Sequence, residues 1–171
     1  MEQTENKVTV RVQMKTAAMF DFLYWHSYSG VMGIINYGFS LAALAALLAG
    51  FGKGNPMATV ALIVLALLFT VINPLLLLQK ADKQVKETPM FAKPITYSFD
   101  EKGFEVAQEG ESGFAAWEEV VLVRETKKTL VLYLGAANAI VLPKDQCADE
   151  MPEIKRLLKT ARPCFVSKLK K

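Results

Sequence analysis

Two long apolar runs stand out in the hydrophobic pattern, between a short alternating segment and a second half made of short strand-like runs. The first run, Gly30–Gly50, and the second, Pro56–Leu78, contain no charged residue. A helix rises about 1.5 Å per residue, so each run is long enough to cross a bilayer core of about 30 Å. The link between them is so short that the helices must be antiparallel neighbours. The pattern predicts a transmembrane helical hairpin over residues 30–78.

The residues that flank the runs predict the orientation of this hairpin. The link carries only Lys53, whereas the outer flanks carry Lys7, Arg11, Lys15, Lys80, Lys83, Lys86 and Lys93. By the positive-inside rule, both termini should be cytoplasmic, in a two-pass protein of the cell (inner) membrane. Aromatic residues just before the first run are typical of an interfacial belt: Phe20, Phe22, Tyr24, Trp25 and Tyr28. Mixed and acidic residues precede the first run, which is also too long for a cleaved signal peptide.

Small residues recur every four positions in the first run, at Gly38, Ala42, Ala46 and Gly50. They share one helix face, and such a face lets another helix approach closely in lipid. We expect the second run of the same chain to be its partner. A seam between two copies of the chain is the alternative.

Two asparagines, Asn36 and Asn73, lie inside the runs at similar depth from the cytoplasmic side, and a hydrogen bond between them is feasible. Pro74 cannot donate to the carbonyl of Thr70, so the second helix should kink there. The runs contain no Asp, Glu, Lys or Arg, which favours a packing role for these residues. An oligomeric transporter is the alternative that would use them, because two helices alone cannot enclose a pore.

After a charged, proline-containing linker over residues 79–94, the pattern changes to alternating apolar positions separated by turn residues. It predicts about six strands, over residues 95–99, 104–108, 114–117, 120–125, 129–134 and 139–142. A closing helix near Asp149–Ala161 has one apolar stripe, which we expect to cover an open end of a curved sheet: Met151, Ile154, Leu157 and Leu158. Alternation over Val8–Val12 predicts a further strand, which would complete the cytoplasmic sheet either of its own chain or of a neighbouring copy.

Several segments together resemble a known family: "SFDEKGFEV", "FAAWEEVVLVRET" and "LVLYLGAANAIVLPKD", after a two-helix hairpin. This layout is similar to that of the YcxB-like membrane proteins, whose C-terminal domain is related to bacterial PH-like domains. The resemblance implies an α+β membrane protein whose hairpin is followed by a PH-like, partly open β-barrel or sheet with a C-terminal capping helix. It divides the chain into an N-terminal strand and interfacial segment (1–29), hairpin (30–78), linker (79–94), PH-like domain (95–162) and basic tail (163–171). The family brings no catalytic residues, and Trp117 is expected to be a core anchor.

The composition and the absence of known motifs exclude several kinds of binding and catalytic site. The 171 residues are 52% hydrophobic and 22% charged, and the net charge of +3 is too small to indicate nucleic-acid binding. Cys147 and Cys164 are too few for a disulfide-rich scaffold or, with the lone His26, for a zinc site. No nucleotide, metal or nucleophile motif is present, so we predict no cofactor, metal or catalytic residue, and no enzyme.

Basic residues near the membrane are the candidate lipid headgroup contacts: Lys80, Lys83, Lys86, Lys168, Lys170 and Lys171. Residues 95–160 hold 8 lysines and arginines against 12 acidic residues, a formal charge of −4 that suits phosphoinositides poorly. The first turn of the domain, where eukaryotic PH domains often place basic phosphate ligands, is Asp100–Gly103. Lys127 and Lys128 are two adjacent basic residues of this otherwise acidic domain that can contact a lipid headgroup locally. The lipid bilayer and a protein partner or a second copy of the chain are the expected partners.

These observations lead to two hypotheses of function. The first is a membrane-anchored cytoplasmic PH-like module that interacts with or regulates other proteins without catalysis. The alternative is a membrane immunity or stress protein that acts through its hairpin, with the small-residue face as the contact surface.

Overall fold

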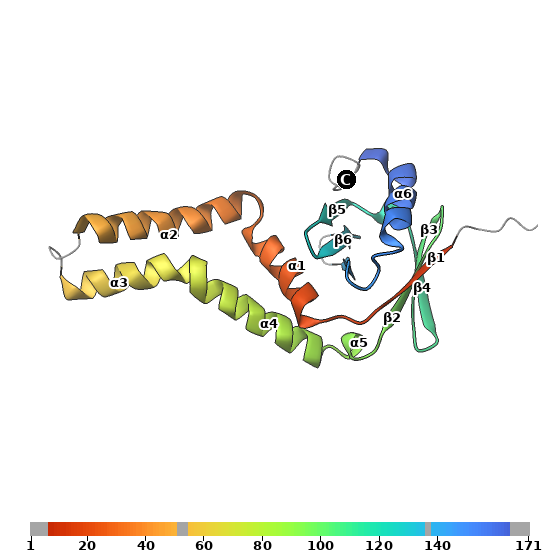
Figure 1. Ribbon diagram of the computed structural model, residues 1–171, viewed down its shortest axis with the longest axis horizontal. Helices are drawn as coiled ribbons and strands as arrows, with labels where there is room; N and C mark the ends of the chain where they lie inside the picture. Colours follow the sequence, from red (N-terminus) through yellow and green to blue (C-terminus); the bar gives the residue numbers. More distant parts are fainter. Residues whose placement is uncertain (1–6, 51–54, 136–137, 165–171) are drawn as a thin grey trace, which may run out of the picture.

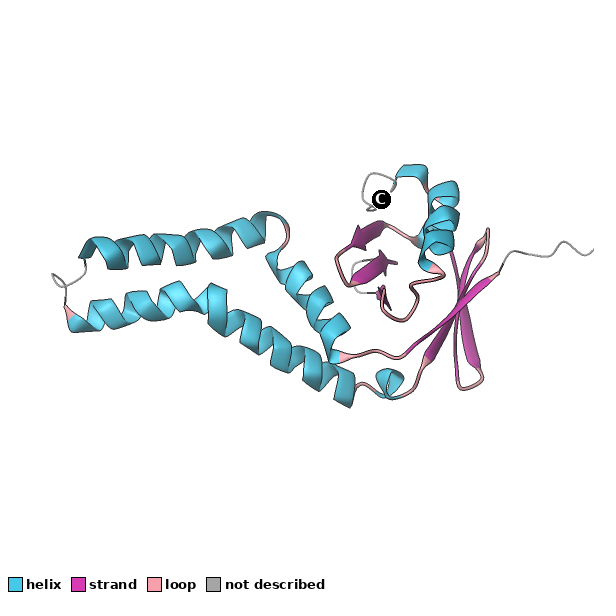
Figure 2. Cartoon of the chain, in the orientation of Figure 1, coloured by secondary structure: helices cyan, strands magenta, loops and turns pink. Residues whose placement is uncertain are grey.

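The chain folds into a long apolar hairpin attached to a domain of two sheets and a helix, as the computed structural model shows (Figures 1 and 2). The structure describes residues 7–50, 55–135 and 138–164. The hairpin lies at one end of the molecule and the sheets at the other, with two diverging helices between them. The 171-residue chain is thus elongated, because the helices of the hairpin bury few side chains against the rest of the chain.

The hairpin consists of α2 (Gly30–Gly50) and a long second helix made of α3 (Pro56–Leu67), the π-helical turn η1 (Leu68–Ile72) and α4 (Asn73–Glu87). Asn55 caps α3, because its side chain accepts a hydrogen bond from the N–H of Met57 at 2.9 Å. Residues 33–50 and 56–87 are long and apolar enough to cross a membrane, which is compatible with a membrane protein. The second helix bends between α3 and α4, at the turn before Pro74 where the kink is predicted (Figure 1).

The charged segment that the sequence analysis assigns to a linker, residues 79–94, is largely helical. Helix α4 continues through most of it to Glu87, and the short helix α5 (Pro89–Ala92) follows. Ion pairs one turn apart support the extension, with Asp82 and Lys86 2.6 Å apart and Lys83 and Glu87 3.8 Å apart. The helix ends before Pro89, which restricts the preceding residue to an extended backbone.

The first sheet has four antiparallel strands in chain order: β1 (Val8–Val12), β2 (Ile95–Phe99), β3 (Gly103–Gln108) and β4 (Glu111–Ala116). Strand β1 precedes the hairpin and β2 follows it, yet the two pair along their whole length, from Val8 opposite Phe99 to Val12 opposite Ile95. The predicted N-terminal strand is therefore confirmed, and it completes the sheet of its own chain. The whole hairpin is an insertion between two neighbouring strands.

The second sheet has three antiparallel strands: β5 (Leu122–Glu125), β6 (Thr129–Tyr133) and β7 (Ala139–Pro143). A single 3₁₀ turn, η2 (Trp117–Glu119), leads into it from β4. The described strands form two separate sheets rather than a closed barrel.

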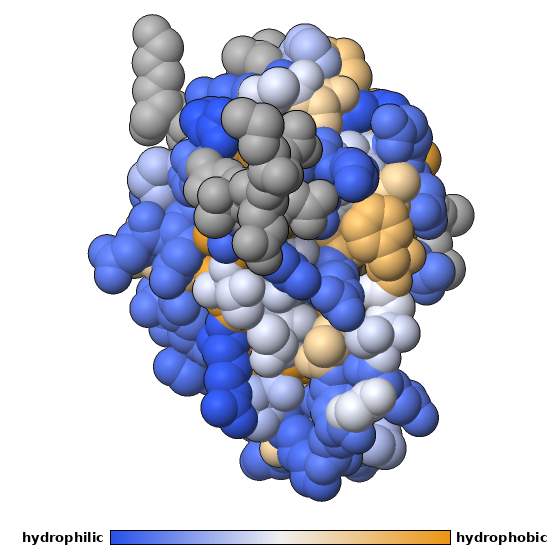
Figure 3. All heavy atoms as spheres, turned by 90° about the vertical axis from the view of Figure 1, so that its right-hand side faces the viewer, coloured by the Kyte–Doolittle hydropathy of each residue, from blue (hydrophilic) through white to orange (hydrophobic). Residues whose placement is uncertain are grey.

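The core of the domain lies between the two sheets and helix α6 (Met151–Ala161). Trp117 is 1% exposed, stacks with Phe99 and meets Phe104 edge to face, while its indole N–H donates to the carbonyl of Asp100 at 2.9 Å. It is a core anchor, as predicted. The predicted apolar stripe of α6 is also confirmed, because all four of its residues are buried: Met151, Ile154, Leu157 and Leu158. The end of the domain that faces away from the hairpin is mainly hydrophilic (Figure 3).

Candidate functional site at the hairpin–domain junction

Helix α1 (Thr16–Tyr28) joins the hairpin to the domain, and it packs on two sides. On one side lies α4, and on the other the face of the second sheet that points away from the core (Figure 1). Met19 on α1 shares a buried cluster with Val131 and Tyr133 on β6. Strand β6 is thus buried on both faces, because Leu130 and Leu132 point into the core of the domain.

Two polar contacts fix α1 in this position. The carboxylate of Asp21 accepts hydrogen bonds from the hydroxyl groups of Thr126 and Thr129, the latter at 2.8 Å, at the turn between β5 and β6. On the opposite side, Thr16 donates to the carboxylate of Asp82 on α4 at 3.1 Å. Hydrogen bonds from Lys86 and Thr16 lower the pKa of Asp82. Helix α1 therefore connects α4 of the hairpin to the second sheet.

The predicted aromatic belt contributes to this packing. Phe22 packs against Tyr133 with the ring centroids 6.2 Å apart. The guanidinium of Arg124 on β5 lies over the ring of Trp25 at 5.0 Å from its centroid, a cation–π arrangement. The hydroxyl of Tyr133 is buried without a hydrogen bond to any described residue, and burial raises its pKa. The belt residues on this side of α1 therefore pack against the second sheet of the domain.

Tyr28 at the end of α1 contacts the π-helical turn in the hairpin. Its hydroxyl donates to the carbonyl of Phe69 at 2.6 Å and accepts from the side-chain amide of Asn73 at 2.9 Å. The N–H of Asn73 bonds to the carbonyl of Leu68, five residues back, which leaves the Phe69 carbonyl available for Tyr28. The hydrogen bond considered between Asn73 and Asn36 is not among the contacts of the described residues. Tyr28 was assigned only to the belt because sequence spacing does not indicate this contact.

The small-residue face of α2 points away from the second helix, so the expected contact within the hairpin is not formed. All four residues of the face are exposed: Gly38, Ala42, Ala46 and Gly50. Burial in α2 falls instead on Gly33, Ser40 and Ala43, and the Ser40 hydroxyl reaches the carbonyl of Leu65 at 3.5 Å. Asn36 is half-buried beside this packing face. A Cβ on Gly33 would lie 1.9 Å from the carbonyl oxygen of Tyr28, so the α1–α2 turn requires a glycine there.

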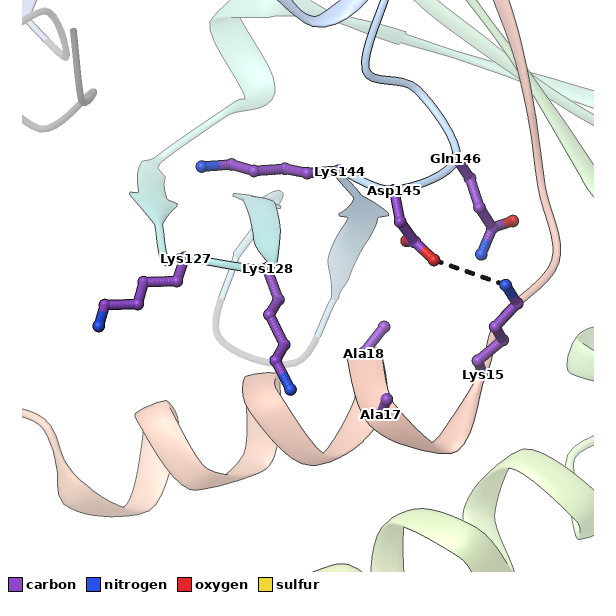
Figure 4. A pocket seen from close by; sticks show the side chains of 8 residues that line it. All are labelled: Lys15, Ala17, Ala18, Lys127, Lys128, Lys144, Asp145 and Gln146. Carbon is purple, nitrogen blue, oxygen red and sulfur yellow. Dashed lines mark hydrogen bonds and ion pairs between the residues drawn. The ribbon is translucent and has the colours of Figure 1, made fainter.

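A basic pocket of about 390 Å³ opens where the start of α1, the β5–β6 turn and the loop after β7 meet (Figure 4). Four lysines and one carboxylate line it: Lys15, Lys127, Lys128, Lys144 and Asp145. Ala17, Ala18 and Gln146 complete the lining. Sequence analysis singled out only Lys127 and Lys128, because the remaining residues are far from them along the chain.

A buried ion-pair cluster lies next to this pocket. Glu125 has a side chain that is 1% exposed, and one carboxylate oxygen accepts from Lys144 at 2.5 Å and from Lys155 at 2.7 Å. Lys144 also donates to the carbonyl of Thr126 at 2.8 Å. These contacts connect β5 to α6 and to the loop after β7. Removing one partner would leave an uncompensated buried charge, which destabilises the fold.

The candidate headgroup lysines on α4 lie just beyond its apolar part. Lys80, Lys83 and Lys86 are exposed, and the last two form the ion pairs described above. Lys168, Lys170 and Lys171 lie outside the described residues. None of the described residues forms a cluster of three or more potential metal-ligating side chains.

Comparison with known proteins finds a family match within the domain. Residues 99–158, from the end of β2 into α6, match the family model of YcxB-like proteins. This part of the chain is therefore similar to the YcxB-like family, as the resemblance predicted. No curated protein and no solved structure matches the chain.

Proposed function

We propose that the chain is a two-pass protein of the bacterial inner membrane, with both termini in the cytoplasm, whose PH-like domain binds a protein partner or a second copy of the chain without catalysis. The observation that carries this proposal is the insertion of the hairpin between β1 and β2. Because both strands belong to one sheet, the chain leaves and re-enters the domain at the same place. Such a domain is held close to the membrane by two covalent connections.

The strand order supports the PH-like assignment. Four strands in one sheet, three in the next and a helix packed at their junction make the layout that the family resemblance implies. Counting β1 as the first strand moves the acidic turn Asp100–Gly103 to the second connection. The first connection is then the hairpin itself, so a headgroup site in the usual first turn has no counterpart in this chain.

The edge strand β4 is the surface that we assign to partner binding. It pairs only with β3 in the described sheet, and its residues Glu111–Phe114 are exposed. Phe114 is 58% exposed, and Val121 just beyond η2 is 56% exposed. An unpaired edge with an exposed aromatic side chain is a template for an added strand.

Photo-cross-linking of the full chain in native membranes tests this assignment. A benzoyl-phenylalanine at position 114 should give a discrete adduct with a partner or with the chain itself. The same probe at Lys159, which is exposed on α6, serves as the control. No adduct from position 114, or the same adducts from both positions, would contradict the proposal.

A second candidate function is favoured by the outward orientation of the small-residue face. In this alternative, the hairpin acts as a membrane immunity or stress device, and the exposed face is its contact surface. Ala42→Leu combined with Ala46→Leu should then abolish hairpin association and protection. Leu44→Phe with Leu48→Phe, which enlarges exposed side chains on the opposite side of the same helix, is the control. Equal association by both variants would contradict this candidate.

A further inference from the structure

The basic pocket beside α1 brings together charges that are far apart in the sequence. Lys15 precedes α1, Lys127 and Lys128 form the β5–β6 turn, and Lys144 with Asp145 follows β7. The domain as a whole carries more acidic than basic residues, so this excess of lysines is a local feature of the fold. An anion is the complementary ligand for such a pocket.

Only two of the four ammonium groups are available inside the pocket. The ammonium group of Lys144 is engaged by Glu125, whose carboxylate it shares with Lys155, and by the carbonyl of Thr126, and Figure 4 shows Lys127 extending away from the pocket. Lys128 extends toward α1 and has no ion pair with any described residue. Lys15 pairs with Asp145 at 3.5 Å, a long contact between two side chains that are more than half exposed. An anion could therefore draw Lys15 away from Asp145 at little cost.

The floor of the pocket adds a second attraction for negative charge. Ala17 and Ala18 belong to the first turn of α1, where the helix dipole is positive, although the N–H of Ala18 already donates to the carbonyl of Lys15 at 3.1 Å. No acidic side chain lies in that turn, and Lys15 at the N-cap position makes no side-chain cap. The pocket thus combines side-chain ammonium groups with the positive end of a 13-residue helix.

We propose that this pocket binds a phosphate group, with Lys15 and Lys128 as its principal ligands. A phosphate carries more charge and more acceptor oxygens than a carboxylate, so it can accept from both lysines at once while the positive end of the helix dipole attracts its charge. The volume suits a small phosphorylated molecule, since ligand pockets of this kind span about 300–1,000 Å³. The phosphate belongs either to a soluble compound or to a lipid headgroup. The proposal goes beyond the proposed function and does not depend on the β4 edge.

Calorimetric titration of the full chain in neutral phosphatidylcholine nanodiscs, with inorganic pyrophosphate as the probe, tests the site. Lys128→Gln should weaken binding by at least about tenfold, because a charge-assisted hydrogen bond is lost. Lys127→Gln removes the same charge from the adjacent residue and should change affinity by less than about twofold, because its contribution is screened. Equal losses in the two variants, or no binding by the wild-type chain together with no retained lipid, would overturn the proposal.

A gain-of-affinity variant guards against misfolding as an explanation. Asp145→Asn removes the one carboxylate that lines the pocket and releases Lys15, so pyrophosphate should bind several-fold more tightly. An affinity that falls or stays unchanged would count against the site.

Native mass spectrometry of the chain released from nanodiscs that contain phosphatidylglycerol identifies the source of the phosphate. A bound phospholipid that is lost in Lys128→Gln but retained in Lys127→Gln indicates a lipid headgroup. Pyrophosphate binding without any retained lipid indicates a soluble ligand. The cross-linking result at position 114 bears on neither outcome, so this proposal and the proposed function can fail separately.

Discussion

The side chains of Tyr28 and Asn73 form a hydrogen bond of 2.9 Å between the end of α1 and the bend of the second hairpin helix. The Tyr28 hydroxyl also donates a hydrogen bond to the carbonyl of Phe69, which the π-helical turn leaves without its usual helical donor. One hydroxyl group thus serves a backbone group and a side-chain amide in an apolar region. The bend therefore depends on a residue that lies 45 positions earlier in the chain.

Tyr28→Phe should destabilise the bend without altering the packing of the ring. The loss of two hydrogen bonds in an apolar environment is expected to lower the free energy of unfolding by about 1–3 kcal/mol. Denaturant unfolding of both proteins in micelles measures this change in the free energy of unfolding. Tyr24→Phe is the control, because the Tyr24 hydroxyl bonds only to the exposed hydroxyl of Tyr37. Equal effects of the two substitutions would contradict the assigned role of Tyr28.

Asp21→Asn should loosen the attachment of α1 to the second sheet. Hydrogen bonds to a charged group contribute about 1.5–3 kcal/mol, and the neutral amide keeps only part of that. Hydrogen exchange should then rise at Lys128 and Thr129, whose N–H groups bond to the Thr126 hydroxyl beside Asp21. Asp149→Asn, at an exposed position before α6, should leave those amides protected. Unchanged exchange in Asp21→Asn would show that apolar packing alone holds α1.

Acid should weaken the contact between α1 and α4. The pKa of Asp82 is lowered in the folded chain, so its carboxylate stabilises the fold above the unfolded value of about 3.9, and the contribution disappears as pH falls through the folded value. The melting temperature of the wild type should exceed that of Asp82→Asn at neutral pH, and the two should converge in acid. Glu87→Gln lies on the same helix and pairs only with Lys83 in the described structure, so it should show a smaller difference.

Trp117→Ala should be among the most damaging substitutions in the domain. It removes the largest fully buried side chain and its hydrogen bond to Asp100, with an expected loss of about 3–5 kcal/mol. Chemical denaturation, followed by the fluorescence of the remaining Trp25, measures this loss of stability. Phe114→Ala, at an exposed aromatic position, should change stability by less than about 0.5 kcal/mol. Similar losses in the two variants would contradict the assignment of Trp117 as the anchor.

The two cysteines should differ in reactivity. Burial raises the pKa of the Cys147 thiol to about 11, and its Sγ donates to the carbonyl of Pro143 at 2.9 Å. Cys164 is exposed. A maleimide at pH 8 should therefore label Cys164 within minutes and Cys147 only after unfolding, because the thiolate is the reactive form. Rapid labelling of Cys147 in the folded chain, read by peptide mass spectrometry, would show that the domain opens locally.

Sequence patterns predicted the elements of this fold closely where local physics decides them. The apolar run Gly30–Gly50 is helix α2 residue for residue, and the stripe of Met151, Ile154 and Leu158 faces the core. Helix and strand periodicities are local properties, so they can be recognised without knowing the partner of each face. The continuation of the second helix past Leu78 is not apparent from the apolar pattern, because that segment is charged, and the helix ends only before Pro89.

The candidate site could be predicted only in part. Lys127 and Lys128 stand out in the sequence, but the fold alone brings Lys15 to them across more than a hundred residues of chain, together with Asp145 from the loop after β7. Likewise, the two faces of β6 have similar apolar residues, and only the docking of α1 explains why Val131 and Tyr133 are buried.

The sequence by itself determined that this protein has an apolar hairpin, a strand on each side of it and a domain of short strands closed by a helix. Only the tertiary structure decided which faces meet. The small residues Ala42 and Ala46 face outward while Ala43 is 4% exposed against the second helix, although all three are equally small. Periodicity defines a face, but the partner of that face depends on the packing and hydrogen bonding of the whole chain. The Tyr28 contact and the pairing of β1 with β2 were decided in the same way.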